Sequence, residues 1–187
     1  SEEFANEDFT HAFRTASRYE SFGRAMSMKR EAEEAGDFKY KWVLVLRYDT
    51  VFFTPTDFTK FDPHNFYICS EPHWPDIHIK GGIHDIVFLS SSNTMDQYSH
   101  LADEIRAGEH SASLLTVAHN MAYAKLWQMF GKDGMDRIQY GWHRYQDVEI
   151  YRMIVHPEQN VVGQQYGALE TKPRMERLLA EIGDHCG

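Results

Sequence analysis

The chain lacks several features that mark specialised classes of protein. Its 187 residues include two cysteines, Cys69 and Cys186, which are too few for a disulfide framework and suit a reducing, cytoplasmic location. Lys and Arg number 19 against 28 Asp and Glu, and the net charge of −9 argues against a nucleic-acid binder, which needs a basic face. No apolar run is long enough to cross a bilayer, so the sequence predicts no membrane segment.

Several catalytic signatures are also missing. The sequence contains no G-x-S-x-G, no P-loop and no G-x-G-x-x-G, which leaves serine hydrolases, P-loop nucleotide triphosphatases and Rossmann dehydrogenases without support. H-E-x-x-H and C-x-x-C are absent as well, so no standard zinc motif is present. The hydrophobic content of 42% is enough for one sizeable core, and no repeat or linker divides the chain. We expect a single domain over residues 1–187.

Helical and strand patterns alternate along the chain. A polar helix-like segment covers residues 1–15, and Ser17 with Glu20 resembles a capping box at the start of an amphipathic helix. The pattern predicts helices over 17–35, 93–107, 111–130 and 173–182, and strands over 41–47, 51–53, 66–69, 85–90 and 146–155. This alternation is typical of an α/β domain with a mixed sheet.

The stretch from Lys41 to Phe53 is the centre of this pattern. Trp42–Leu46 is a continuous apolar run rich in β-branched residues, which predicts a strand buried on both faces at the middle of the sheet. Asp49 follows where the strand ends, and ligands of open α/β sheets bind at the carboxyl ends of strands. Asp49 is therefore a candidate site residue. The alternative is that it caps a turn or pairs with Arg47.

The order of motifs resembles a known family. The motifs are, in chain order, Ser17-x-Tyr19-x-Ser21-x-x-Arg24-Ala25, Arg47-Tyr48-Asp49, His84-Asp85, Met95-Asp96-Gln97-Tyr98 and Glu109-His110-Ser111. Over residues 15–155 this order is similar to the later part of the GT-A-type nucleotide-diphospho-sugar glycosyltransferases, in the group whose acidic motif is Arg-x-Asp. The resemblance implies a three-layer α/β/α fold with a mixed, mostly parallel central sheet. It also implies transfer of a sugar from a nucleotide-diphosphate donor to a glycan or small-molecule acceptor.

The resemblance assigns roles to individual residues. Asp49 matches the acid that binds a divalent cation, Mn²⁺ or Mg²⁺, and such a cation neutralises the departing diphosphate. Arg47 stands where the usual motif has an acid, and its guanidinium can hold phosphate but not metal. Asp85 matches a position that faces the acceptor substrate, where an inverting enzyme needs a general base. Arg24 and Lys29 on the preceding helix match positions within reach of donor phosphate. The alternatives are a structural cap or ion pair at Asp85 and a solvated helix face at Arg24 and Lys29.

The resemblance is incomplete at the front of the chain. Enzymes of the GT-A type begin with a βαβ half that holds the nucleoside, and here about two strands and a helix of it are missing before Phe9. We therefore expect a partial domain, whose exposed edge strand would pair with a second copy in a homodimer. A non-catalytic domain of the same fold that binds a carbohydrate or a protein is the first alternative.

A cluster of histidines suggests a second alternative. His73, His78, His84 and Asp85 lie close together after Cys69, and Cys, His and Asp are zinc ligands. This cluster would make the chain a metal-dependent hydrolase. The spacing matches no standard zinc motif, and histidines in loops are usually just exposed.

Overall fold

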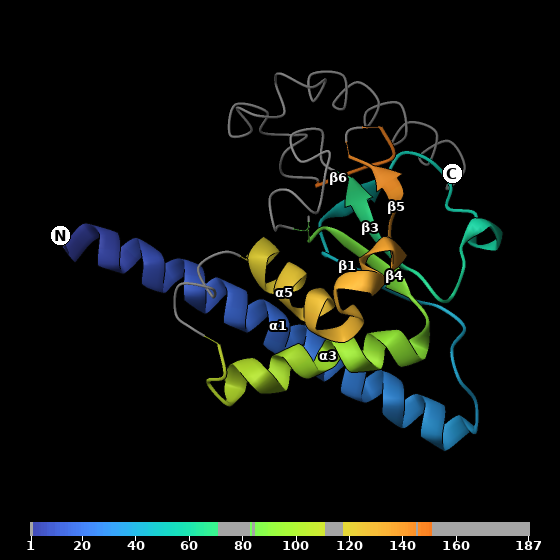
Figure 1. Ribbon diagram of the computed structural model, residues 1–187, viewed down its shortest axis with the longest axis horizontal. Coiled ribbons are helices and arrows are strands. Elements are labelled where there is room, and N and C mark those ends of the chain that lie inside the picture. Colours follow the sequence, from blue (N-terminus) through green and yellow to red (C-terminus); the bar gives the residue numbers. More distant parts are fainter. Residues whose placement is uncertain (1, 71–82, 84, 111–117, 145, 151–187) are drawn as a thin grey trace, which may run out of the picture.

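The computed structural model describes residues 2–70, 83, 85–110, 118–144 and 146–150. The helices and strands, with two short 3-10 helices η1 and η2, are α1 (Glu2–Gly36), β1 (Val43–Leu46), β2 (Thr50–Phe52), η1 (Phe58–Lys60), β3 (Phe66–Ser70), β4 (Val87–Ser90), α3 (Ser92–Arg106), α5 (Ala118–Phe130), η2 (Lys132–Arg137), β5 (Ile138–His143) and β6 (Val148–Ile150) (Figure 1). Within these residues no helix is both long and apolar enough to span a membrane.

Four strands form the main sheet, in the order β1-β4-β3-β5. Strand β4 runs antiparallel to β1 and β3, whereas β3 and β5 are parallel. The predicted α/β class and mixed sheet are confirmed. The prediction that the sheet is mostly parallel is wrong for the described strands, because β4 runs against both of its neighbours. Strands β2 and β6 form a separate antiparallel pair.

The predicted central position of β1 is also wrong for the sheet that the described strands form. The apolar run Trp42–Leu46 forms the expected strand, but this strand lies at the edge of the described sheet and its residues are only half-buried or exposed. The two inner strands are instead the buried ones: every residue of β4 is buried, and so is every residue of β3 except Ser70. A run of apolar residues indicates a strand without specifying its neighbours, so it does not distinguish an edge from the centre.

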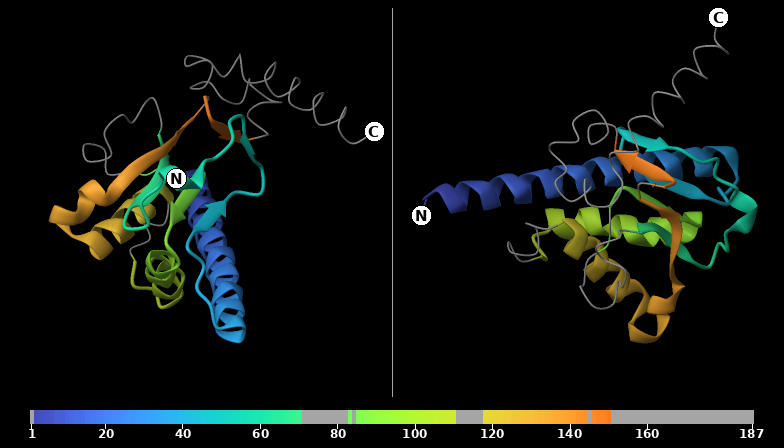
Figure 2. Two further views of the ribbon diagram at one scale, coloured as in Figure 1. Left: turned by 90° about the vertical axis from the view of Figure 1, so that its right-hand side faces the viewer. Right: turned by 90° about the horizontal axis from the view of Figure 1, so that it is seen from above.

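The two faces of the sheet have different covers. On one face, α1, α3 and α5 pack against Phe66, Ile68 and Phe88. On the other face, alternate side chains of the same strands pack against aromatic residues from β2 and the segment between β2 and β3, such as Phe52 and Phe61. Figures 1 and 2 show the helices together on one side of the strands, with β2 and β6 away from them. A helical layer therefore covers one face of the sheet within the described residues.

Other elements differ from expectation in extent. The helix predicted from residue 93 begins at Ser92, where the hydroxyl of Ser91 caps it by accepting from the backbone N–H of Thr94 at 3.4 Å. The predicted helix 111–130 is described from Ala118 onward, and Gly131 follows its end with φ of 66°. The predicted strand 146–155 is described as β6, and the predicted helix 173–182 lies outside the described residues. Strand β5 was missed.

Helix α1 is continuous over 35 residues, and its N-terminal turns project past the rest of the described chain (Figure 2). The capping box predicted at Ser17 is wrong, because Ser17 lies inside the helix and its carbonyl accepts from the Ser21 hydroxyl. No proline or glycine precedes this point to end an earlier helix. The helix ends as expected at Gly36. Asp37 takes the left-handed conformation, and Phe38 donates its N–H to the Glu33 carbonyl.

The middle of α1 packs closely on α3 at one glycine. A methyl group at Gly23 would lie 2.7 Å from the Cβ of Ala102, which is closer than two carbon atoms can approach. Gly23 lets the helices meet here at the cost of helix propensity. The contact sets the position of α1 along α3, and hence the position of the α1 face that looks toward β1.

Gly23→Ala is expected to lower the free energy of unfolding by about 1–3 kcal/mol, because overpacking outweighs the gain in helix propensity. Urea denaturation measures this change. The double variant Gly23→Ala with Ala102→Gly removes the clash and is expected to recover most of the loss. If Gly23→Ala were as stable as the original chain, this result would contradict the close contact between α1 and α3 at Gly23.

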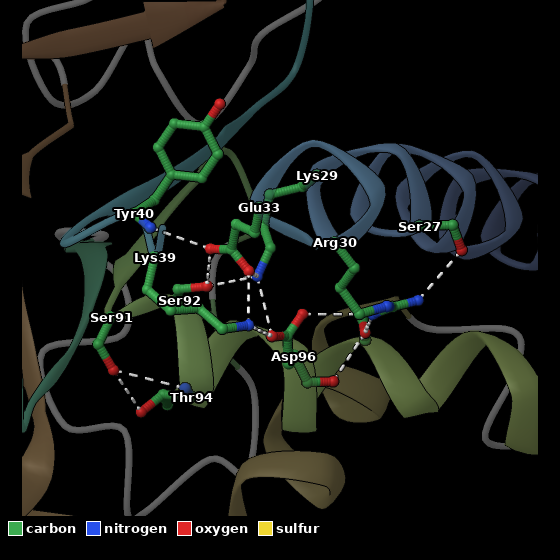
Figure 3. Close-up of polar contacts among 11 residues, drawn as sticks. Ser27, Lys29, Arg30, Glu33, Lys39, Tyr40, Ser91, Ser92, Thr94 and Asp96 are labelled. Carbon is green, nitrogen blue, oxygen red and sulfur yellow. Dashed lines mark hydrogen bonds and ion pairs between the residues drawn. The ribbon is translucent and has the colours of Figure 1, made fainter. Parts of the chain in front are cut away.

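A buried ionic cluster fixes the C-terminal end of α1 (Figure 3). The Glu33 carboxylate accepts from Lys39 Nζ at 2.7 Å, from the backbone N–H of Tyr40 at 3.0 Å and from the Ser92 hydroxyl at 2.5 Å. Lys29 Nζ lies 3.0 Å from Glu33 and 2.8 Å from Asp96. The cluster therefore ties α1 to the start of α3 and to the segment that leads into β1.

These contacts lower the pKa of Glu33 to about 2. Burial alone would raise the pKa, but the four donors around the carboxylate outweigh it. An unfolded Glu takes up its proton near pH 4.5, so the contribution to stability is complete above that pH and is lost as the pH falls toward 2. We expect the loss of stability between these two pH values to be smaller in Glu33→Gln than in the original chain. Urea midpoints across this pH range measure it, and equal losses would contradict the assignment.

Candidate functional site

A cavity of about 1070 Å³ lies between α1 and the edge strand β1. Its walls come from α1 between His11 and Lys29, from residues 43–48, and from Asp85, Ala118 and His119. The two predicted site residues Arg47 and Asp85 both line it, although they come from separate motifs. It is a concave space of the size that small-molecule ligands occupy.

Arg47 and Asp49 form a two-point ion pair at the end of β1. Arg47 Nε and Nη2 donate to the two carboxylate oxygens of Asp49 at 2.9 and 3.0 Å. The hydrogen bonds to Asp49 raise the pKa of Arg47 above its ordinary value. The pairing alternative considered for Asp49 is therefore present in the structure. Asp49 does not line the cavity, and it holds the guanidinium that does.

Asp85 is buried beside the cavity and has partners from two helices. Arg18 of α1 donates to the Asp85 carboxylate and to its backbone carbonyl. His119 of α5 places Nδ1 3.6 Å from the carboxylate and 3.0 Å from the Ile83 carbonyl oxygen. Because a carbonyl oxygen only accepts, Nδ1 is the donor in the latter contact. The ion-pair alternative considered for Asp85 is thus also present.

The side chains that line the cavity include more cations than acids, although the chain as a whole is acidic. Its lining includes four cationic side chains, Arg14, Arg18, Lys29 and Arg47, and one acid, Asp85, whereas the whole chain carries −9. Arg14 and His11 are exposed near the N-terminal end of the cavity. Three of these cations are paired with carboxylates: Arg18 with Asp85, Lys29 with Glu33 and Asp96, and Arg47 with Asp49. An anionic ligand would therefore meet cationic groups that already have acidic partners.

Arg18 and His119 were not identified in the sequence. A signal for Arg18 was present, since Arg14, Arg18 and Lys29 recur at spacings that place them on one face of a helix. His119 gave no comparable signal, because its place beside Asp85 depends on how α5 packs.

Arg24 lies outside the cavity. Its side chain is 77% exposed and pairs with Glu20 at 3.1 Å, which corresponds to the solvated helix face considered as its alternative. Lys29 does line the cavity, but its ammonium group contacts Glu33, Asp96 and the Ser92 hydroxyl. Of the two predicted phosphate contacts on α1, Lys29 is thus at the cavity and Arg24 is not.

The predicted cation at Asp49 has a poor set of ligands among the described residues. A hard cation prefers several oxygen ligands, and both oxygens of Asp49 already accept from Arg47. No group of three His, Cys, Asp or Glu residues suited to a metal occurs in the part of the chain that the structure describes. His73, His78 and His84 lie outside that part, so the predicted histidine cluster does too. Cys69 is buried in the sheet.

Comparison with protein-family models, with curated proteins and with solved structures returned no match.

Proposed function

We propose that the chain binds the diphosphate of a nucleotide-sugar donor in the cavity between α1 and β1, as a glycosyltransferase of the GT-A type or the larger part of one. The observation that carries the proposal is the meeting of Arg47 and Asp85, from two motifs of that family's order, in one cavity. A three-layer fold, with helices on the second face of the sheet as well, belongs to the same proposal.

Arg47 is the residue that we propose to hold the phosphates. A guanidinium offers two parallel N–H groups to phosphate oxygens, and Asp49 fixes one edge of it in place. Arg14 and Arg18 add positive charge along the same wall. As the bond between sugar and diphosphate breaks, negative charge grows on the leaving group, and these fixed cations stabilise it.

Asp85 is proposed to contact the acceptor. Its carboxylate lies beside the cavity, where it could accept the hydrogen bond of an acceptor hydroxyl and take up its proton in an inverting transfer. Arg18 pairs with this carboxylate and holds it in place. We therefore expect Asp85 to position the hydroxyl as well as to receive its proton.

Because the residues around Asp49 suit Mn²⁺ or Mg²⁺ poorly, Arg47 is the group proposed to hold the phosphates. Cation binding at Asp49 stays a prediction, and it has a direct test. If Asp49 binds the cation, Mn²⁺ strengthens nucleotide binding and Asp49→Asn abolishes that effect. If Asp49 only holds Arg47, Mn²⁺ has no effect and Asp49→Asn weakens binding with or without it.

The test is thermal unfolding with a panel of nucleoside diphosphates and their sugars, with and without Mn²⁺. A ligand at about 100 times its dissociation constant adds roughly 2.7 kcal/mol, which corresponds to about 5–10 °C for a chain of this size. We expect a shift with a nucleoside diphosphate and none with the matching nucleoside, since the proposed contacts of Arg47 are with the phosphates. No shift with any nucleotide would contradict the proposal.

The second candidate is a non-catalytic domain of the same fold that binds a carbohydrate or a protein. The closed Arg47–Asp49 pair favours it, because the acid that the family uses at the donor is engaged by an arginine. Release of nucleoside diphosphate from a donor sugar distinguishes the two candidates. Turnover in the chain that stops in Asp85→Asn supports the enzyme, whereas donor binding without turnover supports the binding domain.

A further inference from the structure

The parallel strands β3 and β5 end side by side, and their last residues, Ser70 and His143, lie opposite each other (Figure 1). Ser70 Oγ and His143 Nδ1 are 2.8 Å apart. Ser70 is half-buried and His143 is exposed, and neither lines the cavity between α1 and β1. Ligands of α/β sheets commonly bind at the carboxyl ends of parallel strands. The pair thus occupies such a position outside the site proposed for the nucleotide.

A β-bulge brings these two side chains together. The ladder between β3 and β5 is regular as far as Ile68, where β5 inserts one extra residue, Gly141, before Ser70 pairs with His143. Without the extra residue, Ser70 would pair with Trp142, and His143 would lie beyond the end of β3. Bulges redirect side chains in this way and are common next to active sites.

The backbone around the pair is fixed from two sides. The N–H of His143 donates to Asp147 Oδ2 at 2.8 Å, and its carbonyl accepts from the Asp147 N–H at 2.8 Å. The other carboxylate oxygen of Asp147 accepts from the Thr54 hydroxyl at 3.0 Å. The N–H of Arg144 donates to the Ser70 carbonyl at 3.2 Å. These contacts hold the histidine beside the serine without using the side chain of either.

A serine within hydrogen-bond distance of an imidazole is the arrangement that activates serine as a nucleophile. When its hydrogen is on Nε2, a neutral His143 accepts at Nδ1 from the Ser70 hydroxyl. Nucleophile and base are recognised by geometry, since the same arrangement recurs on unrelated folds with different sequence motifs. The missing G-x-S-x-G motif therefore does not argue against this pair.

We propose that Ser70 and His143 form a catalytic pair that hydrolyses small uncharged carboxylic esters. Ser70 Oγ forms a bond to the carbonyl carbon, and its proton moves to His143 Nδ1. The bond to the ester oxygen breaks, and the alcohol leaves with that proton. Water then attacks the acyl carbon, His143 takes a proton from the water and returns it to Ser70, and the carboxylic acid is released. The nearby Asp147 carboxylate repels anions, so an uncharged ester suits the site.

The first test uses a fluorescent fluorophosphonate, which phosphonylates activated serines with loss of fluoride. The expected result is one adduct, which peptide mass spectrometry maps to Ser70. Ser70→Ala is expected to abolish labelling, and His143→Ala to slow it about 100-fold, because the base no longer takes the serine proton. No labelling, labelling at another residue, or an unchanged rate in His143→Ala would overturn the proposal.

The second test is hydrolysis of p-nitrophenyl acetate. The rate of the original chain is expected to exceed those of Ser70→Ala and His143→Ala by about 100-fold. The matched control is Ser21→Ala, which removes an exposed serine whose hydroxyl donates to the Ser17 carbonyl, and it should keep both the labelling and the hydrolysis. Equal hydrolysis by the original chain and Ser70→Ala would overturn the proposal.

This inference goes beyond the proposed function and does not depend on it. The adduct on the original chain locates the nucleophile without any variant, so a variant that failed to fold would not prevent the test. The nucleotide panel tests the cavity and the ester tests the Ser70–His143 pair, so that either proposal can fail without the other.

Discussion

Glu33→Ala is expected to lower the free energy of unfolding by about 3 kcal/mol, the loss typical of breaking a buried charge cluster on one side. The substitution removes the acceptor for Lys39, for the Tyr40 amide and for the Ser92 hydroxyl. It also leaves Lys29, whose side chain is only 10% exposed, with Asp96 as its remaining acidic partner. The end of α1 would then be held less firmly against α3.

The matched control is Glu31→Ala, which removes an exposed carboxylate from the same helix two residues earlier. We expect its effect to stay within about 0.5 kcal/mol. Thermal unfolding separates the two, since about 3 kcal/mol corresponds to roughly 6–12 °C for a chain of this size. Equal midpoints for the two variants would mean that the cluster does not hold α1 in place.

Arg47→Ala is expected to weaken binding of a nucleoside diphosphate by about 10–100-fold, because hydrogen bonds to charged groups contribute about 1.5–3 kcal/mol. The substitution also leaves Asp49 without the guanidinium that both of its oxygens contact. Repulsion between the remaining carboxylate and the phosphates then adds to the loss. Isothermal titration measures the affinity.

Arg106→Ala provides the comparison, since it removes an arginine that is 57% exposed on α3 and does not line the cavity. Its affinity for the nucleoside diphosphate should match that of the original chain. If Arg47→Ala and Arg106→Ala weakened binding equally, the cause would be the overall charge of the chain, and Arg47 would have no special place at the phosphates.

The sequence was sufficient to predict where most of the strands lie along the chain. It was not sufficient to predict which strands lie beside one another in the sheet. Apolar runs predicted β1, β3 and β4 within a few residues, because each run is short and bounded by turn residues. The edge position of β1 depends on which strand packs beside it, and no local pattern records that. Strand β5 was missed because its sequence, from Ile138 to His143, mixes exposed and buried residues without regular alternation.

The candidate site was predicted only in part, because local sequence patterns do not record contacts between distant segments. Arg47 and Asp85 were identified from motif order, and both line the cavity. Their partners Asp49, Arg18 and His119 determine what these side chains can do, and two of the three come from distant helices. Whether a carboxylate is available to a metal or engaged by an arginine depends on side-chain geometry, which the order of motifs leaves open.

A crystal structure of the chain with a bound nucleoside diphosphate tests the central claim most directly. The account predicts phosphate oxygens within hydrogen-bond distance of the Arg47 guanidinium, inside the cavity between α1 and β1, with Asp85 facing the place where the sugar would be attached. A nucleotide bound elsewhere, with Arg47 still contacting Asp49 alone, would contradict it.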